Sequence, residues 1–303
     1  GLVGWEMCIR DSPHTTRAPG CGWGRPPPSP QTPRILSMMT TLPFHTSVPE
    51  TQAAPALPMG AHAITLHCGT ALQLLPQRAL WWPAARMVMV ADVHFGKAAT
   101  FRRAGQPVPH GTTADNLARL DAVLAATSAD HLVFLGDFLH ARSGAADALW
   151  QQLLPWRQRH ARVAMSLVRG NHDLHAGDPP AALALALVNE PWLPRADAPV
   201  LACHHPQAVA GHTVLAGHLH PTLWLRGPAR DALRAPCFGW GDGQLILPAF
   251  GAFTGTAPDT LPAHWTQFAV CLAAWWRFLG GVPRVCGGWR ASANGFKLQK
   301  AAG

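Results

Sequence analysis

The stretch Arg86-Met87-Val88-Met89-Val90-Ala91-Asp92-Val93-His94 joins a short apolar run to two side chains that can bind a metal ion. Residues 86–91 fit a buried strand, and Asp92 and His94 come directly after it. Further apolar runs of the same character are His131–Leu135, Val163–Val168, Pro199–Cys203 and Thr213–Ala216. The sequence therefore predicts several buried strands, the first of which ends at a pair of polar residues.

Helical patterns lie between the predicted strands. Thr112 or Thr113 can cap a first helix, whose apolar face would hold Leu117, Leu120, Val123 and Leu124. A second helix is predicted over Ala145–Arg159, where Pro155 would kink or split it. Strands that alternate with helices predict an α/β sandwich.

Polar motifs recur where the predicted strands give way to loops. They are Asp92-Val93-His94, Gly136-Asp137-Phe138-Leu139-His140, Gly170-Asn171-His172-Asp173, His204-His205-Pro206 and Gly217-His218-Leu219-His220. Each motif alone is compatible with an ordinary surface turn, but together they occupy the strand ends at which α/β sheets place their sites. Carboxylate, amide and imidazole ligands suit Mn, Fe or Zn. Two such ions about 3.5–4 Å apart can clamp a phosphate and activate a bridging hydroxide for in-line attack on phosphorus.

The order of these motifs resembles the calcineurin-like metallophosphoesterase superfamily. The closest resemblance is to the bacterial ligase-associated DNA damage response endonucleases, the PdeM family, and it covers roughly residues 60–256. It rests on Ala91–Ala98, Phe101–Pro109, Thr112-Thr113, Val168–Asp173, Ala216–Pro221 and Leu247–Gly255. The resemblance implies a four-layer α/β/β/α sandwich. Thr256 stands where the family would have a second glycine, and no short closing strand is evident after it.

The resemblance also implies two sets of metal ligands. One ion would be held by Asp92, His94 and His220, the second by Asn171, His204 and His218, and Asp137 would bridge both. His204 directly follows its strand, which favours it as the ligand over His205, its rival.

The remaining polar residues receive supporting roles. By resemblance, His172 would stabilise the leaving oxygen or protonate it as a general acid, and Asp173 would orient the imidazole of His172. His140 is expected to support a ligand rather than bind a metal ion. Substrate phosphate would contact Lys97, Arg102 and Arg103, for which an ordinary solvated loop is the alternative. Trp81, Trp82 and Trp224 are expected to pack in the core or against loops rather than to stack on bases.

The first functional hypothesis is a metal-dependent phosphodiesterase that acts as a DNA endonuclease in repair. It would use two divalent ions, with Mn expected and Fe, Zn or Mg as alternatives. The DNA substrate, and partners such as a DNA ligase, a helicase and an exonuclease, are implied by the resemblance alone. One alternative is a small-molecule phosphoesterase that acts on a nucleotide or a lipid pyrophosphate. The other is a non-catalytic subunit of a DNA-repair assembly, which the presence of every expected ligand disfavours.

The formal net charge of +8 lies mostly at the two ends of the chain. Four Arg against Glu6 and Asp11 give +2 before Met38. Five Lys or Arg against Asp259 give +4 from Pro258 onward, which leaves only +2 for the middle. The charge of the motif-bearing region is therefore weak support for a nucleic-acid partner.

The two ends also differ from the middle in composition. Gly24–Pro30 is rich in proline, and we interpret residues 1–37 as a disordered, non-native extension, with a natural start at Met38 or Met39. Residues 38–256 would form the metallophosphoesterase domain, and residues 257–303 a tail that is either a genuine appendage or the product of a frameshift. No stretch reaches the about 18–20 apolar residues of a transmembrane helix, and no secretory signal is evident, so a cytoplasmic location is expected.

Overall fold

The computed structural model describes residues 58–108, 110–142, 147–226 and 232–255, and then shorter segments at 257–258, 260–271, 274–279, 282–286, 289–292 and 295–300. The disordered extension predicted for residues 1–37 lies outside the described residues. The domain limits at residues 37 and 256 stay predictions.

The first sheet has seven strands in chain order. They are β1 (His62–Thr65), β2 (Ala71–Leu75), β3 (Ala79–Trp82), β4 (Met87–Ala91), β5 (His131–Leu135), β6 (Ala164–Val168) and β7 (Ala186–Val188). Strands β1 to β4 are antiparallel neighbours, whereas β4 to β7 run parallel. The strands predicted near residues 86, 131 and 163 are confirmed. The antiparallel strands β1 to β3 were not predicted.

The second sheet follows the order β16-β15-β14-β11-β12-β9-β8. Its strands are β8 (Val200–Ala202), β9 (Thr213–Ala216), β11 (Ala232–Gly241), β12 (Gln244–Ile246), β14 (Thr266–Cys271), β15 (Ala274–Leu279) and β16 (Val282–Cys286). Two further strands branch from this path, since β10 (Pro221–Arg226) pairs with β11, and β13 (Ala257–Pro258) pairs with β10. A separate pair is formed by β17 (Trp289–Ser292) and β18 (Gly295–Lys300).

The last strand of the fold, which is not evident in the sequence after residue 256, is present in the structure. Strand β14 pairs antiparallel with β11, and β15 then pairs with β14. Phe268 in β14 is buried, and it belongs to the core between the two sheets. The residues around Phe268 show no clear strand pattern in the sequence. The strand is recognised only from its pairing with β11, which lies far away in the chain.

The helices are α1 (Lys97–Arg103), α2 (Thr112–Thr127), α3 (Asp147–Arg159) and α4 (Asn171–Ala176), with short 3-10 turns η1 (Pro83–Ala85) and η3 (Ala181–Leu183). The cap predicted for α2 is wrong by one residue. Gly111, with φ of 85°, occupies the cap position, and Thr112 already lies in the first turn. Helix α3 continues through Pro155, so of the predicted kink or split the split does not occur.

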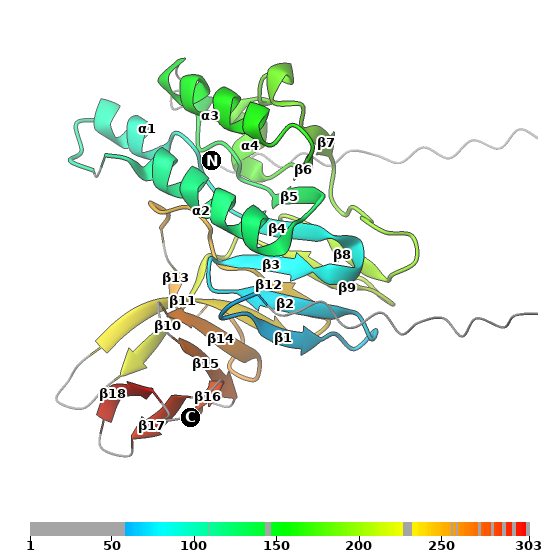
Figure 1. Cartoon of the computed structure of the whole chain (residues 1–303), viewed down its shortest axis with the longest axis vertical. Helices are drawn as coiled ribbons and strands as arrows, with labels where there is room; N and C mark the ends of the chain where they lie inside the picture. The colour runs from blue at the N-terminus through cyan, green and yellow to red at the C-terminus, as the bar shows by residue number, and fades with distance from the viewer. Residues whose placement is uncertain are drawn as a thin grey trace, which may run out of the picture. The chain divides into compact units, whose positions relative to one another are not determined.

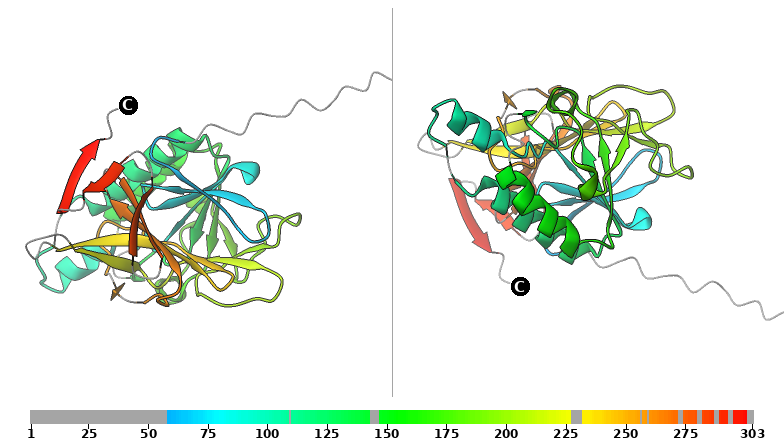
Figure 2. Two further views of the ribbon diagram at one scale, coloured as in Figure 1. Left: turned by 90° about the horizontal axis from the view of Figure 1, so that it is seen from below. Right: turned by 90° about the horizontal axis from the view of Figure 1, so that it is seen from above.

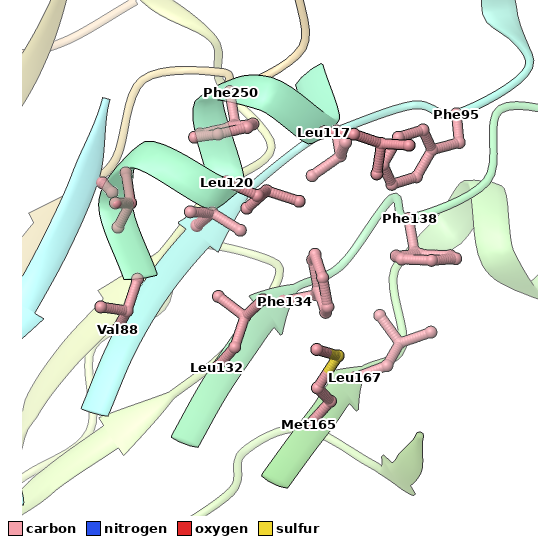
Figure 3. Close-up of a cluster of buried hydrophobic side chains, with 14 of the residues drawn as sticks. Val88, Phe95, Leu117, Leu120, Leu132, Phe134, Phe138, Met165, Leu167 and Phe250 are labelled. Carbon is pink, nitrogen blue, oxygen red and sulfur yellow. The ribbon is translucent and has the colours of Figure 1, made fainter. Parts of the chain in front are cut away.

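Helices α2 and α3 cover one face of the first sheet (Figure 1). The predicted face of α2 is buried there, and Leu120 meets Val88, Leu132 and Phe134 of the strands in one cluster (Figure 3). At about 25 cal/mol per Å² of apolar surface, such burial is the main force that holds a helix onto a sheet.

The opposite face of the first sheet packs against the second sheet, and the two appear as separate layers in Figure 2. The α/β class with two stacked sheets is confirmed. The outer face of the second sheet packs against Leu261 and Trp265 of a loop in the described part of the chain. Trp81 and Trp82 are buried as predicted.

Trp224 is not buried as expected. It is 42% exposed on β10, opposite Arg234 of β11, whose guanidinium lies 5.9 Å from the indole ring. Trp224 and Arg234 thus form a cross-strand pair between β10 and β11.

Candidate metal centre

The predicted site residues come together because their strands end at the same place. Strands β4, β5 and β6 are parallel, as are β8 and β9, so their carboxyl ends point to one side of each sheet. The pairing of β4 with β5 even continues into the loops, where the backbone N–H of His94 donates to the carbonyl of Asp137 at 2.8 Å. Two motifs that are more than 40 residues apart are thus held side by side.

The ligand loops have a backbone conformation that ordinary residues rarely adopt. Positive φ angles occur at Asp92 (54°), His94 (49°), Asp137 (50°), His218 (70°) and His220 (47°). Each such residue costs of order 1–3 kcal/mol unless the surroundings stabilise it, and strain of this kind clusters at functional sites. The strained backbone at these residues therefore places the predicted ligand side chains close together at a cost in conformational free energy.

Two glycines of the motifs are required by space rather than by turn geometry alone. A Cβ at Gly136 would lie 2.2 Å from Nδ1 of His204, and a Cβ at Gly170 would lie 2.4 Å from Oδ1 of Asp137. Both distances are far below van der Waals contact. The Gly-Asp and Gly-Asn-His motifs thus begin with glycine because a predicted ligand from another motif packs directly on their backbone.

The first donor set consists of Asp92, His94 and His220. The Nε2 atoms of the two histidines are 3.3 Å apart, and Nε2 of His220 lies 3.5 Å from Oδ1 of Asp92. Asp137 Oδ2 lies 3.6 Å from Nε2 of His94. One ion could be held among these atoms.

The second donor set consists of Asn171, His204 and His218. Nε2 of His204 lies 2.9 Å from Oδ1 of Asn171 and 3.0 Å from Nδ1 of His218. Asp137 Oδ1 is 3.5 Å from the same His204 nitrogen. The two oxygens of Asp137 therefore face different donor sets, which is the arrangement predicted for a bridging carboxylate.

His204 and His205 differ sharply in their surroundings. The His204 side chain is fully buried, and its Nδ1 lies 3.1 Å from the carbonyl of Leu135, so that Nε2 can present its lone pair to the site. His205 is 43% exposed, and its Nδ1 contacts Glu190 at 2.5 Å. The geometry agrees with His204 as the ligand, although His205 stays within reach of the same atoms.

Burial favours neutral imidazoles at the site. Burial lowers the pKa of His94, and nearby Lys97 lowers it further. Burial also lowers the pKa of His204 and of His218. For His220 burial acts in the same direction, but the hydrogen bond and charge of Asp92, together with the carbonyl of Gly255, outweigh burial and raise the pKa. Neutral imidazoles have a free lone pair, which a metal ion requires.

The donor set fits divalent ions. Asp92 Oδ1 is buried and, among the described residues, has no hydrogen-bond partner. Histidine nitrogens that face each other at 3.0–3.3 Å repel unless a proton or a cation lies between them. Burial, and then the charge of Asp92, raise the pKa of Asp137. A cation would relieve each of these costs, and oxygen and imidazole donors suit Mn, Fe or Zn.

His172 lies at the edge of the donor sets. Its Nδ1 contacts the carbonyl of His140 at 2.9 Å, and its Nε2 lies 3.9 Å from Oδ2 of Asp137. The His140 ring stacks on the His172 ring with centroids 5.0 Å apart. His140 therefore orients His172, and a ring nitrogen of His140 also lies within 4.8 Å of donor nitrogens of His94 and His172.

Asp173 does not orient His172 as predicted. Its carboxylate accepts hydrogen bonds from the backbone N–H groups of Leu139 and Gly170, both at 3.0 Å. Burial raises the pKa of this carboxyl to about 6. Asp173 joins the loop after β5 to the start of α4 because its buried oxygens take the nearest unpaired donors.

The three basic residues predicted to contact phosphate lie on α1. Lys97 begins the helix and is half-buried, and the charges of Asp137 and Asp92 act on its ammonium group. Arg102 and Arg103 are exposed at the other end of α1. The structure thus brings Lys97 to the metal centre and leaves the two arginines in its surroundings.

Sequence reasoning missed Glu190. Its Oε2 accepts the backbone N–H groups of His204 at 2.6 Å and of His205 at 2.8 Å, so it fixes the loop that carries the buried ligand. A signal did exist, because Glu190 follows the end of β7 as the other polar residues follow their strands. It was overlooked because β7 is only three residues long.

Two donor sets that share one carboxylate, at the ends of parallel strands, are the arrangement of a metal-dependent phosphoesterase. The family model for calcineurin-like phosphoesterases matches residues 85–229. The chain is 40% identical to the nuclease MPE of Pseudomonas putida, and the match covers 75% of this chain and 100% of that one with a TM-score of 0.60. The chain therefore belongs to the calcineurin-like phosphoesterases, as its motifs predicted, and is a metal-dependent hydrolase.

A second solved structure, the phosphoesterase Yfce from E. coli, is 13% identical, and the match covers 71% of this chain and 99% of that one with a TM-score of 0.32. No curated protein sequence matches the chain. Within the part of the chain that the structure describes, no helix is long and apolar enough to cross a membrane.

Proposed function

We propose that this protein is a metal-dependent phosphodiesterase that cleaves phosphodiester bonds within DNA. The observation that supports it best is the position of Asp137, whose two carboxylate oxygens face separate donor sets at 3.5 Å and 3.6 Å. Its 40% identity to a protein described as a nuclease favours a nucleic acid over a small ester as the substrate.

The residues around Asp137 suggest how the reaction would be assisted. Divalent ions held by the two donor sets would neutralise the charge of the phosphate and activate water. Lys97, which is half-buried beside the two carboxylates, can donate to a non-bridging phosphate oxygen. His172 Nε2 faces the same space, and with Nδ1 bonded to the carbonyl of His140 it can hold or supply the proton for the leaving oxygen.

The metal and the biological setting extend the proposal. Mn is the expected ion, with Fe, Zn or Mg as alternatives, since oxygen and imidazole donors suit several divalent ions and the described site has no thiolate. A role in DNA repair, with a ligase, a helicase and an exonuclease as partners, follows from the sequence resemblance. The cytoplasmic location stays a prediction of the sequence.

The proposal is tested with metal-stripped protein and two substrates. Hydrolysis of bis(p-nitrophenyl) phosphate and nicking of supercoiled plasmid are measured after Mn, Mg or Zn is restored. Asp137→Ala should lower both activities by more than about 100-fold, since loss of residues that merely support metal ligands already costs 10–100-fold. The matched control is Asp130→Ala, which removes a carboxylate at the opposite end of β5, where the side chain is 68% exposed and pairs with Arg86.

The outcomes separate the candidate functions. Metal-restored turnover of both substrates that Asp137→Ala abolishes and Asp130→Ala retains would support the nuclease. Turnover of the small ester alone would reassign the protein to small-molecule esters. If folded, metal-loaded protein hydrolyses neither, the catalytic proposal fails and a non-catalytic subunit becomes the better explanation.

A further inference from the structure

A hollow of about 200 Å³ opens beside the metal centre, and neither donor set lines it. Its walls are Lys97 and Phe101 from α1 and Phe253, Thr254 and Gly255 from the loop after β12. We call it the Phe101–Phe253 pocket. It is smaller than the about 300 Å³ at which pockets for drug-sized ligands begin, so it can receive one ring system rather than a whole nucleotide.

The pocket adjoins the reactive groups on two sides. The carbonyl of Gly255 accepts a hydrogen bond from Nδ1 of His220, so one wall bonds directly to a predicted metal ligand. On the other side, the Phe101 ring lies 5.9 Å from the ring of His140, which stacks on His172. Any group bound in the pocket therefore lies next to the phosphate that the metal centre would hold.

The two phenylalanines form an aromatic corner. Their ring centroids are 5.6 Å apart and their planes are almost perpendicular, at 87°. Both rings are only partly buried. Two partly exposed phenyl rings at a polar site expose apolar surface to water, and a planar ligand would cover it with one face-on and one edge-on contact.

The loop that carries Phe253 is fixed before any ligand binds. Buried Asn116 of α2 accepts the backbone N–H of Ala252 at 2.8 Å, and Arg119 donates to the carbonyl of Phe250 at 2.5 Å. Phe250 also donates its N–H to the carbonyl of Ala91 at 2.8 Å. Because these bonds hold the loop in place, little conformational entropy has to be lost when the aromatic corner is occupied.

We propose that the Phe101–Phe253 pocket binds the nucleobase next to the phosphate that is cleaved, with Lys97 of its wall contacting that phosphate. The proposal rests on the proposed function, since it assigns part of the substrate to a particular place beside the metal centre. Base stacking on aromatic side chains tolerates any sequence, because each base has a planar face.

The test compares two phosphate monoesters of equal charge, one that carries a nucleoside and one that carries a methyl group in its place. Binding of thymidine 5′-monophosphate and of methyl phosphate to Mn-loaded protein is measured by isothermal titration calorimetry, which does not require turnover. Phe101→Ala should weaken binding of the nucleotide by about 5- to 150-fold, the range for removal of one stacking ring, and leave methyl phosphate unchanged. Phe101→Leu keeps apolar bulk without a planar face and should weaken nucleotide binding by an intermediate factor.

Trp224→Ala is the matched control, because Trp224 is an exposed aromatic residue outside the pocket. It should change neither affinity. Equal binding of the two monoesters by the wild-type protein overturns the proposal. It is also overturned if Phe101→Leu keeps the full affinity for the nucleotide, or if Trp224→Ala lowers that affinity.

Plasmid nicking is followed on the same samples. Intact nicking together with any of these contrary results would overturn the pocket and leave the proposed nuclease standing. Absent nicking with the predicted binding differences would overturn the nuclease and leave the pocket standing.

Discussion

Replacing Asp137 by asparagine should stabilise the metal-stripped protein while it abolishes catalysis. Carboxylate oxygens of Asp92 and Asp137 lie within 4.8 Å of each other. At an effective dielectric constant of 20, two unit charges at that distance repel by about 3 kcal/mol. Asparagine is isosteric and keeps an oxygen for the His172 backbone N–H, which Asp137 binds at 3.0 Å, so the substitution removes mainly this repulsion. We therefore expect the free energy of unfolding to rise by about 1–3 kcal/mol.

The gain should depend on pH in a defined direction. Burial, and next the charge of Asp92, raise the pKa of Asp137 above its ordinary value. An acid whose folded-state pKa is raised costs stability once the pH exceeds its unfolded-state pKa of about 3.9, and the cost grows until the pH passes the folded-state pKa. The advantage of Asp137→Asn should thus be small below about pH 4 and largest near neutrality.

The assay is urea unfolding of chelator-treated protein at several pH values, repeated with added Mn. With the ions restored, the order should invert, because an ion that binds only the folded wild type stabilises it by RT ln(1 + [L]/Kd). A variant that is less stable than the wild type without metal at pH 7, or equally stabilised by Mn, would refute the assignment of Asp137 as a buried bridging carboxylate.

Other substitutions test the supporting structure. Gly136→Ala should destabilise the fold by more than about 1–2 kcal/mol in urea unfolding, because φ of 74° disfavours alanine and the new Cβ would meet His204; unchanged stability would contradict the close approach. Glu190→Ala should lower Mn affinity about 10–100-fold in calorimetry, since it releases the backbone of His204 and His205, and wild-type affinity would deny it that role. Asp173→Ala should lower the free energy of unfolding by about 1–3 kcal/mol, because two backbone N–H groups lose their acceptor. A loss of activity without a loss of stability would instead support the role predicted from the sequence, in which Asp173 orients the His172 imidazole.

Buried strands could be predicted from the sequence, whereas the pairing of distant strands could not. The strands near residues 86, 131, 163, 200 and 213 were predicted because a buried parallel strand is a short apolar run, which is a local property. Strands β1 to β3 escaped, although Leu72, Leu74 and Leu80 are buried in them, because turns between short strands give weaker patterns. The pairing of β14 with β11 joins distant segments and has no local signature.

The sequence by itself determined which residues can form the metal centre. The polar motifs after the apolar runs, whose order resembles that of the calcineurin-like family, indicated these residues, because parallel strands bring their carboxyl ends to one edge. Only the tertiary structure decided how those residues are used. It buries His204 and leaves His205 at the rim, turns Asp173 to the backbone, and brings Glu190 and the Phe253 loop to the site. Such choices depend on distances between segments that are far apart in the chain, and no local pattern of residues contains those distances.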